Sequence, residues 1–343
     1  PGNEDSGMFA PQIAIAVLIS IVMVVSLTGN SLVLMVIINT RSLRRLNNML
    51  IVSLATIDLV RSVVVMPLFI VVELSVVTQL PKGLCPMYHA LHLSCEMVSI
   101  YNLTVISLER VFVISRPLVY QLMITLRKMA VLVCVLWVLG FVYGSLQIVW
   151  FIPKKDIPEF SGFNPSAYAY QDSSEDGVCQ YAPSPEYAIV DFVICLVAPL
   201  LIMISCYLKI FCVVQSQMKR IAPTSTNIDC SDIMTVTMTQ RSRMRINSSA
   251  SIMTNTSTKS KRGLFRLSDN KAVRMTSIVV GAFMICWLPY NIIFLLKQMH
   301  PDCVSALTWD IFSSLVFLSS AINPFIYNFY SGEFRRALRR ILT

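Results

Sequence analysis

Seven long, mostly apolar runs recur along the chain, and they restrict its fold more than any other feature. A helix needs roughly 20 apolar residues to cross the hydrocarbon core of a bilayer. Only 14% of the residues are charged and 55% are hydrophobic, so a water-soluble globule would lack the polar surface to cover itself. The sequence therefore predicts an all-α membrane protein, a seven-transmembrane helix bundle with helices near 10–40, 46–73, 83–115, 126–151, 184–217, 268–298 and 304–330.

Two further segments complete a single domain that takes in residues 1–343. In the segment 331–342, apolar residues three to four positions apart alternate with arginines. This pattern is typical of a short amphipathic helix on the inner surface of the membrane. The segment 218–267 is rich in Ser, Thr, Asn, Lys and Arg, and we predict a flexible third intracellular loop there, because it cannot bury enough apolar surface to become ordered.

The net charge of +9 is divided by side of the membrane rather than gathered on a face that would bind nucleic acid. Lys and Arg fall mainly in the odd-numbered loops and after the last helix, and these regions are expected to be cytoplasmic. We predict a multi-pass plasma-membrane protein with the N-terminus outside, the C-terminus cytoplasmic and no nucleic-acid partner. Cys85 and Cys179 then share an oxidising compartment and can form a disulfide, which leaves Cys303 over.

Several polar residues lie inside the apolar runs, where lipid makes them costly and where they indicate function. Those near mid-depth of the first, second, third and seventh helices are Asn30, Asp58, Ser99, Ser319, Ser320 and Asn323. We expect them to converge around the Asp58 carboxylate, where a sodium ion suits the oxygen ligands. A proton or a water that bridges the same groups is the alternative. Prolines that remove a helical hydrogen bond, and so can act as hinges, are Pro67, Pro199, Pro289 and Pro324.

Short motifs on all seven helices match one family in the correct order. They are Gly29-Asn30, Leu54-Ala55-Thr56-Ile57-Asp58, Cys85, Glu109-Arg110-Val111, Trp137, Pro199, Tyr207, Phe283, Cys286-Trp287-Leu288-Pro289-Tyr290 and Asn323-Pro324-Phe325-Ile326-Tyr327, with Phe334 beyond them. The chain resembles the rhodopsin-like (class A) G-protein-coupled receptors over almost its whole length.

The resemblance implies an activation mechanism. Glu109 and Asp269 would hold the Arg110 guanidinium in the resting form by charge-assisted hydrogen bonds. Outward movement of the sixth helix would break this clamp and open a groove for a heterotrimeric G protein, with arrestin and receptor kinases as further inner partners. Val111 departs from the family, which usually has an aromatic residue there. The other switch residues implied are Ile100, Pro199, Tyr207, Phe283, Trp287, Asn323, Pro324 and Tyr327, and the G-protein contacts are Arg110, Pro117 and Leu118.

Locally the chain is most similar to the muscarinic and histamine branch of amine receptors, through Ile100-Tyr101-Asn102-Leu103, Trp287-Leu288-Pro289-Tyr290-Asn291 and Trp309. Amine receptors place an aspartate on the third helix to hold the ligand ammonium, and here that position is His92. Phe317 also stands where those receptors commonly have a tyrosine. The usual amine cage is therefore altered at two positions.

Other ionisable groups can replace this cage. His92 and Glu96 are four residues apart and share a helical face. We predict a buried ion pair between Arg61 and Glu96, with His92 as a hydrogen-bonding neighbour and Asp191 as the anchor for a basic group of an extracellular small molecule or short peptide. The expected ligand-binding residues are His92, Glu96, Asp191, Tyr290, Asn291, Trp309 and Ser313. The alternative is a self-satisfied pocket in an orphan receptor with high constitutive activity.

Three other classes of function fit the sequence less well. A light sensor would need a retinal-binding lysine where Phe317 stands. Transporters tend to show inverted repeats or paired broken helices, and neither pattern is found. No metal-ligand cluster and no nucleophile with a base and an orienting acid lies together in the sequence, so we expect no enzyme and no cofactor beyond the sodium ion.

Overall fold

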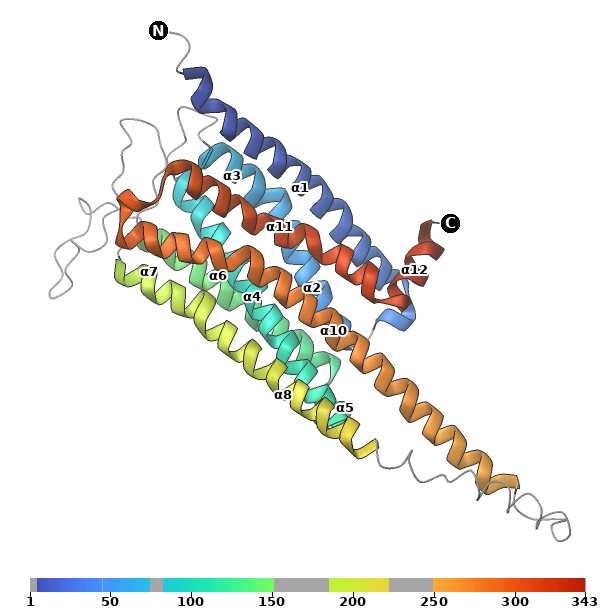
Figure 1. Cartoon of the computed structure of the whole chain (residues 1–343). Coiled ribbons are helices and arrows are strands. Elements are labelled where there is room, and N and C mark those ends of the chain that lie inside the picture. The colour runs from blue at the N-terminus through green and yellow to red at the C-terminus, as the bar shows by residue number, and fades with distance from the viewer. Residues whose placement is uncertain (1–4, 45, 75–82, 151–184, 222–248, 343) are drawn as a thin grey trace, which may run out of the picture.

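The computed structural model describes residues 5–44, 46–74, 83–150, 185–221 and 249–342 of the chain. All regular structure within these ranges is helical. The α-helices, shown in Figure 1, are α1 (Asp5–Asn39), α2 (Leu46–Val60), α3 (Met66–Val72), α4 (Leu84–Ser115), α5 (Pro117–Met123), α6 (Leu126–Trp150), α7 (Pro185–Phe192), α8 (Ala198–Ile221), α10 (Ser249–Met299), α11 (Ala306–Tyr330) and α12 (Gly332–Leu342).

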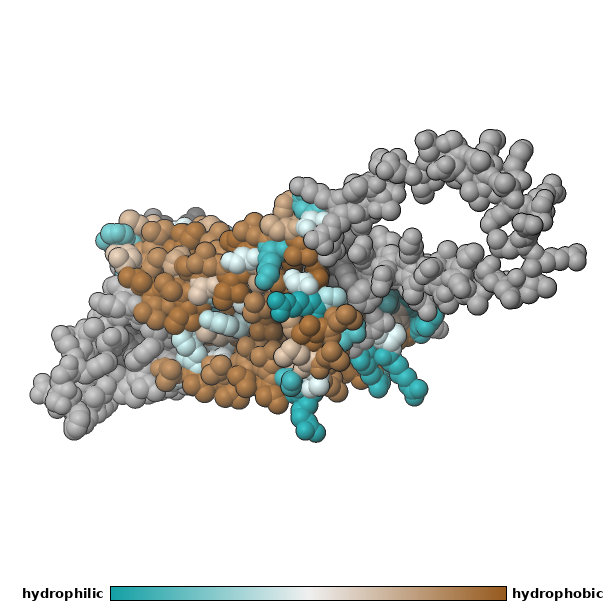
Figure 2. Space-filling model, turned by 90° about the horizontal axis from the view of Figure 1, so that it is seen from below, coloured by the Kyte–Doolittle hydropathy of each residue, from teal (hydrophilic) through white to brown (hydrophobic). Residues whose placement is uncertain are grey.

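Seven helical segments are long and apolar enough to cross a membrane, which confirms the predicted fold class. Their bounds are Ala10–Asn39, Asn48–Val72, Leu84–Ser115, Leu126–Leu146, Ala188–Val213, Arg274–Met299 and Ala306–Tyr330. Large apolar side chains such as Val17, Leu139 and Phe211 are exposed on the bundle. Figure 2 shows the broad hydrophobic belt that such residues form. An apolar surface of this extent suits contact with lipid chains.

Two of the membrane segments contain a single π-helical turn. One turn, Arg61–Val65, joins α2 to α3, and the other, Val193–Val197, joins α7 to α8. Pro67 and Pro199 follow these turns, and each proline lacks the N–H that a regular helix would use and crowds the preceding turn. A wider turn accommodates this defect. The π-turns change which way the side chains around them point, and Arg61 lies in the first of them.

Helix α4 lies in the middle of the bundle and packs against α2, α6 and α8. Gly140 and Gly144 allow α6 to approach it closely. A Cβ atom at Gly140 would lie 3.3 Å from the Ser94 carbonyl oxygen, and one at Gly144 would collide with the Ala90 carbonyl oxygen and the Ser94 hydroxyl. Small residues four apart are a common means of bringing membrane helices together. The close contact fixes the position of α4, which carries most of the polar residues described below.

Helix α10 differs from the prediction at its inner end. It begins at Ser249 and runs without interruption to Met299, so residues 249–267 are helical rather than part of a loop. Helix α8 likewise continues to Ile221, and residues 222–248 lie outside the described part. Adding a turn to an existing helix avoids the cost of nucleation, so a polar extension can remain helical without a core of its own.

The amphipathic helix predicted at 331–342 is present as α12. Phe334 and Ala337 are buried against the bundle, and α12 contacts α1 and α11. Arg335, Arg336 and Arg339 are exposed on its opposite side. In Figure 1 this helix turns away sharply from α11 at the end of the bundle.

Candidate functional site

One end of the bundle carries the acid–arginine pair that the sequence predicts for the inner end. The Arg110 Nη2 atom lies 3.5 Å from Glu109 Oε2, and both residues are buried. Tyr120 on α5 donates a hydrogen bond of 2.6 Å to Glu109 Oε1. Burial, together with the neighbouring Glu109 carboxylate, raises the pKa of the Tyr120 phenol, which therefore remains protonated and able to donate. The side chain of Asp269 lies outside the described residues, so its part in the clamp stays a prediction.

Sequence reasoning missed Tyr120 at this site. It lies on the short helix α5, which begins with the predicted G-protein contacts Pro117 and Leu118. Leu118 is 76% exposed, as a docking residue should be. Its contact with Glu109 depends on how α5 packs against α4, which the sequence does not show.

The polar groups expected near Asp58 do converge. Asn323 donates a hydrogen bond of 2.9 Å from Nδ2 to Asp58 Oδ2. Asn30 donates from Nδ2 to the Ser320 carbonyl oxygen at 3.0 Å, and thereby ties α1 to α11. Asp58 and Ser320 are completely or almost completely buried. The cluster therefore links α1, α2 and α11 at mid-depth.

Arg61 reaches this same cluster instead of Glu96. Its Nη1 and Nη2 atoms donate hydrogen bonds of 3.2 Å to the hydroxyls of Ser320 and Ser99, respectively. Its guanidinium carbon lies 5.3 Å from the ring centroid of Trp287. The predicted ion pair between Arg61 and Glu96 is not formed, because the Arg61 side chain meets α4 one turn deeper, at Ser99.

His92 also differs from its expected role. Its ring lies among aromatic rings, with centroid distances of 5.8 Å to Tyr88, 5.9 Å to Phe317 and 6.3 Å to Trp287. Neither ring nitrogen has a hydrogen-bond partner among the described residues. His92 is therefore a packing residue of the pocket wall, and it does not serve as a polar neighbour of Arg61 and Glu96.

Glu96 and Asp191 form a second acidic centre above Arg61. Glu96 is 3% exposed and Asp191 is 6% exposed. Asp191 is the charged residue with the largest electrostatic effect on Glu96, followed by Arg61, and Asn291 is a hydrogen-bonding neighbour of Glu96. Within the described part of the chain, Glu96 Oε1 has no hydrogen-bond partner.

Asp191 is held more firmly than Glu96. Tyr143 donates a hydrogen bond of 3.0 Å to Asp191 Oδ1, and the Cys195 thiol approaches the same oxygen at 3.3 Å. Sequence reasoning did not identify Tyr143 or Cys195. The spacing of Asp191 and Cys195, four residues apart, was a usable signal, whereas Tyr143 comes from α6 and required the packing of two helices to be known.

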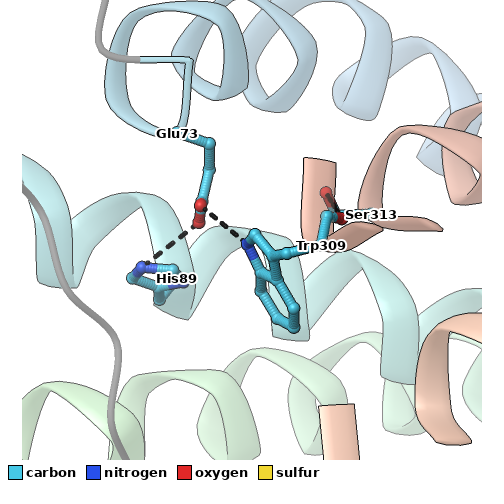
Figure 3. A network of polar contacts seen from close by, with 4 residues as sticks. All are labelled: Glu73, His89, Trp309 and Ser313. Atoms are coloured by element: carbon cyan, nitrogen blue, oxygen red, sulfur yellow. Dashed lines mark hydrogen bonds and ion pairs between the residues drawn. The ribbon is translucent and has the colours of Figure 1, made fainter. Parts of the chain in front are cut away.

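Another group of polar side chains lies at the opposite end of the bundle from Arg110, and sequence reasoning did not identify it. Figure 3 shows Glu73, which follows α3, between His89 and Trp309. Glu73 Oε1 lies 3.6 Å from His89 Nε2, and Trp309 Nε1 donates to Glu73 Oε2 at 3.2 Å. Lys297 Nζ lies 3.8 Å from the Trp309 ring centroid. Burial raises the pKa of Glu73 above its usual 4.5, and the Trp309 hydrogen bond and the Lys297 charge oppose this effect.

The remaining predicted pocket residues lie between the pair of Glu96 and Asp191 and the group around Glu73. Tyr290 packs against His92 at 6.1 Å and Trp309 at 5.8 Å. Ser313 donates its hydroxyl to the Trp309 carbonyl at 2.7 Å, so it is satisfied within α11. Asn291 likewise donates to the Trp287 carbonyl at 3.0 Å.

The predicted switch residues lie beneath this space. Phe283 stacks on Trp287 with ring centroids 5.2 Å apart, and Trp287 Nε1 donates to the Ser319 hydroxyl at 3.3 Å. Ile100 and Tyr327 are buried in the core. Pro199 and Tyr207 belong to α8, and Pro324 lies within α11. Their part in switching stays a prediction.

The cysteines agree with the predicted outer location of a disulfide. Cys85 at the start of α4 is disulfide-bonded, while Cys179 lies outside the described residues, so the pairing of these two stays a prediction. Cys303 is free and exposed.

The described residues form a helical bundle with seven membrane-length helices, a buried acid–arginine pair near one end and further buried polar groups along its length, which is the architecture of a seven-transmembrane receptor. Residues 29–327 match the family described as 7 transmembrane receptor (rhodopsin family). The chain belongs to this family.

Similar proteins include dopamine receptor 1 of Drosophila melanogaster, with 28% identity over 96% of this chain and 62% of that protein. The D(1) dopamine receptor of Carassius auratus is 30% identical over 98% of this chain and 91% of its own length. The histamine H2 receptor of Cavia porcellus is 27% identical over 96% of this chain and 79% of its own length. The chain thus spans less than two thirds of the Drosophila receptor.

Proposed function

We propose that this chain is a G-protein-coupled receptor of the plasma membrane, and not an enzyme, which binds a small cationic molecule from outside and activates a heterotrimeric G protein through outward movement of α10. Family membership and similarity to dopamine and histamine receptors support this proposal. The observation that carries the choice of ligand is the pair of buried acids, Glu96 and Asp191.

Two carboxylates that share a buried site repel each other, and both can be ionised only if a positive charge joins them. Arg61 donates its hydrogen bonds to Ser99 and Ser320 rather than to Glu96. A ligand ammonium between Glu96 and Asp191 would supply the charge. It would take over the role that amine receptors give to the aspartate which His92 replaces here.

The competing interpretation is a pocket whose own residues satisfy one another. Glu96 Oε1, which has no hydrogen-bond partner among the described residues, opposes it. In such a pocket Glu96 should be fully paired, because an unpaired buried charge is strongly unfavourable. The aromatic rings of Tyr290 and Trp287 border the same space and suit the organic part of a cation.

At the inner end, we propose that Arg110 with Pro117 and Leu118 contacts the G protein, and that arrestin and receptor kinases act on the same face. The arginines of α12 suit contact with anionic lipids of the cytoplasmic leaflet. In this proposal the C-terminus lies inside and the N-terminus outside, and Cys85 lies on the oxidising side, where Cys179 is its proposed partner.

The test combines a ligand screen with charge-neutralising variants. Membranes that contain the full chain are assayed for guanine-nucleotide exchange with a panel of monoamines, beginning with dopamine and histamine. For an amine that activates, we expect Glu96→Gln and Asp191→Asn each to lower the potency at least about tenfold, because truncating one member of a buried charge pair is costly.

Ser205→Ala is the matched control, since the exposed Ser205 hydroxyl donates only to the Leu201 carbonyl of its own helix at 2.7 Å and its loss should leave the potency unchanged. The proposal fails if an activating amine retains its potency in both acid variants. It also fails if only neutral or anionic compounds activate the receptor.

A further inference from the structure

The polar cluster around Asp58 already contains a cation that belongs to the chain. The Arg61 guanidinium is 1% exposed and lies at mid-depth between α4 and α11. Its two hydrogen-bond acceptors, the hydroxyls of Ser99 and Ser320, belong to the six polar residues that were expected to converge where a sodium ion suits the oxygen ligands. A hydroxyl oxygen that accepts a hydrogen bond from a guanidinium keeps one lone pair, but the positive charge beside it repels a metal ion that would use this lone pair.

The charge of Arg61 is also well matched to its surroundings. Arg61 acts electrostatically on Asp58, and Ser320 is a hydrogen-bonding neighbour of both residues. The serine hydroxyl can accept from the guanidinium and donate to the carboxylate, so it transmits the interaction without direct contact between the charges. A buried guanidinium stays protonated, and hydrogen bonds together with a nearby carboxylate lower the cost of burying it.

We propose that the Arg61 guanidinium is a tethered cation which takes the place of a sodium ion beside Asp58, so that the chain binds no monovalent metal ion there. The inference does not depend on the identity of the ligand. It concerns a residue that the motifs of the receptor family do not include, and it replaces the sodium reading of the same cluster.

A tethered cation differs from a bound ion in what it contacts. Arg61 touches the face of Trp287, which stacks on Phe283 and is hydrogen-bonded to Ser319. A sodium ion among oxygen ligands would make no such contact, and it could leave the protein. Arg61 instead connects the Asp58 cluster permanently to the aromatic residue whose movement is expected to accompany activation.

Thermal denaturation of the purified full chain tests the proposal without any ligand. The midpoint Tm is measured in sodium chloride, potassium chloride and choline chloride at equal ionic strength. We expect the unmodified chain to show no difference between the salts. Arg61→Ala should open the Asp58 cluster to a small ion, and its Tm should rise with sodium but not with choline, because a ligand that binds only the folded state stabilises it.

Arg61→Ala combined with Asp58→Asn is the matched control and should lose the sodium response. The proposal is overturned if sodium specifically stabilises the unmodified chain, or if Arg61→Ala folds and shows no response to sodium.

If Arg61→Ala cannot be purified, surface expression of Arg61→Lys and Arg61→Met decides between the readings. A cation requirement predicts that Arg61→Lys reaches the surface and that the neutral Arg61→Met, of similar length, does not. Equal expression of these two variants would refute the requirement.

Discussion

Removal of one hydroxyl group, in Tyr120→Phe, should raise signalling in the absence of ligand. The Tyr120 phenol donates the 2.6 Å hydrogen bond that holds Glu109 in position for Arg110. The substitution keeps the aromatic ring and its edge contact with Phe112, whose centroid lies 5.8 Å away. It therefore leaves packing intact and removes a single donor from a buried carboxylate, which then favours protonation and holds Arg110 less well.

The size of the effect follows from the kind of bond that is lost. A hydrogen bond to a charged group contributes about 1.5–3 kcal/mol. If the bond exists only in the resting form, its loss changes the ratio of active to resting receptor by roughly tenfold to a hundredfold. Basal nucleotide exchange on G protein in membranes, normalised to the amount of receptor at the surface, measures this ratio.

Two comparisons make the test specific. Tyr101→Phe also removes a tyrosine hydrogen bond, to the Ile194 carbonyl at 3.1 Å, but far from Arg110, and it should leave basal exchange unchanged. Tyr120→Phe should add little to Glu109→Gln, because both act through the same carboxylate. Basal exchange at or below that of the unmodified chain in Tyr120→Phe would refute the reasoning.

Three further predictions concern the outer end and the packing of the bundle. Glu73 has a raised pKa in the folded protein. Its contribution to stability is therefore fully present below its usual pKa of 4.5 and is lost as the pH rises through the raised pKa. Glu73→Gln should raise Tm at neutral pH and flatten the dependence of Tm on pH. Gly144→Ala should lower stability by about 1–3 kcal/mol through overpacking, measured as Tm or surface expression, while Gly281→Ala, whose Cβ would meet nothing within 4 Å, should not. Cys303 is free and exposed just before α11, so a membrane-impermeant maleimide should label it on intact cells and should not label the Cys303→Ser variant. Cys134 is exposed within the membrane span of α6 and should not react.

The sequence was sufficient for those parts of the site that depend on residues at fixed spacing along one helix. Glu109 and Arg110 are neighbours in the chain, and their location at the inner end follows from the membrane spans. Asp58 and Asn323 lie on different helices, yet each is a polar residue at mid-depth of an apolar run, and depth alone was enough to bring them together.

The parts that failed depend on the direction in which a side chain leaves its helix. Arg61 lies in a π-helical turn, and the geometry of a regular helix therefore predicts the wrong neighbours for its side chain. It contacts Ser99 rather than Glu96, although the two are less than one turn apart on α4. Glu73 follows the last residue of a membrane span and looks like an ordinary interfacial acid until His89 and Trp309 are seen beside it.

These positions arrange the buried charges in successive layers from the mouth of the bundle to its inner end. In that order, the layers contain Glu73 with His89 and Lys297, then Glu96 with Asp191, then Arg61 with Asp58, and finally Arg110 with Glu109. The layer of Glu96 and Asp191 brings two buried acids together.

Arg61 lies directly below this acidic layer and is the second charged influence on Glu96, so its one positive charge is shared between the acid above and Asp58 below. A ligand cation that neutralised Glu96 would leave Arg61 wholly to Asp58 and would change the force on the Trp287 ring that Arg61 touches. Electrostatic coupling of this kind acts in both directions. Arg61→Lys, which keeps the charge but changes its contact with Trp287, should therefore alter the affinity of an activating cation without direct contact between Arg61 and that cation.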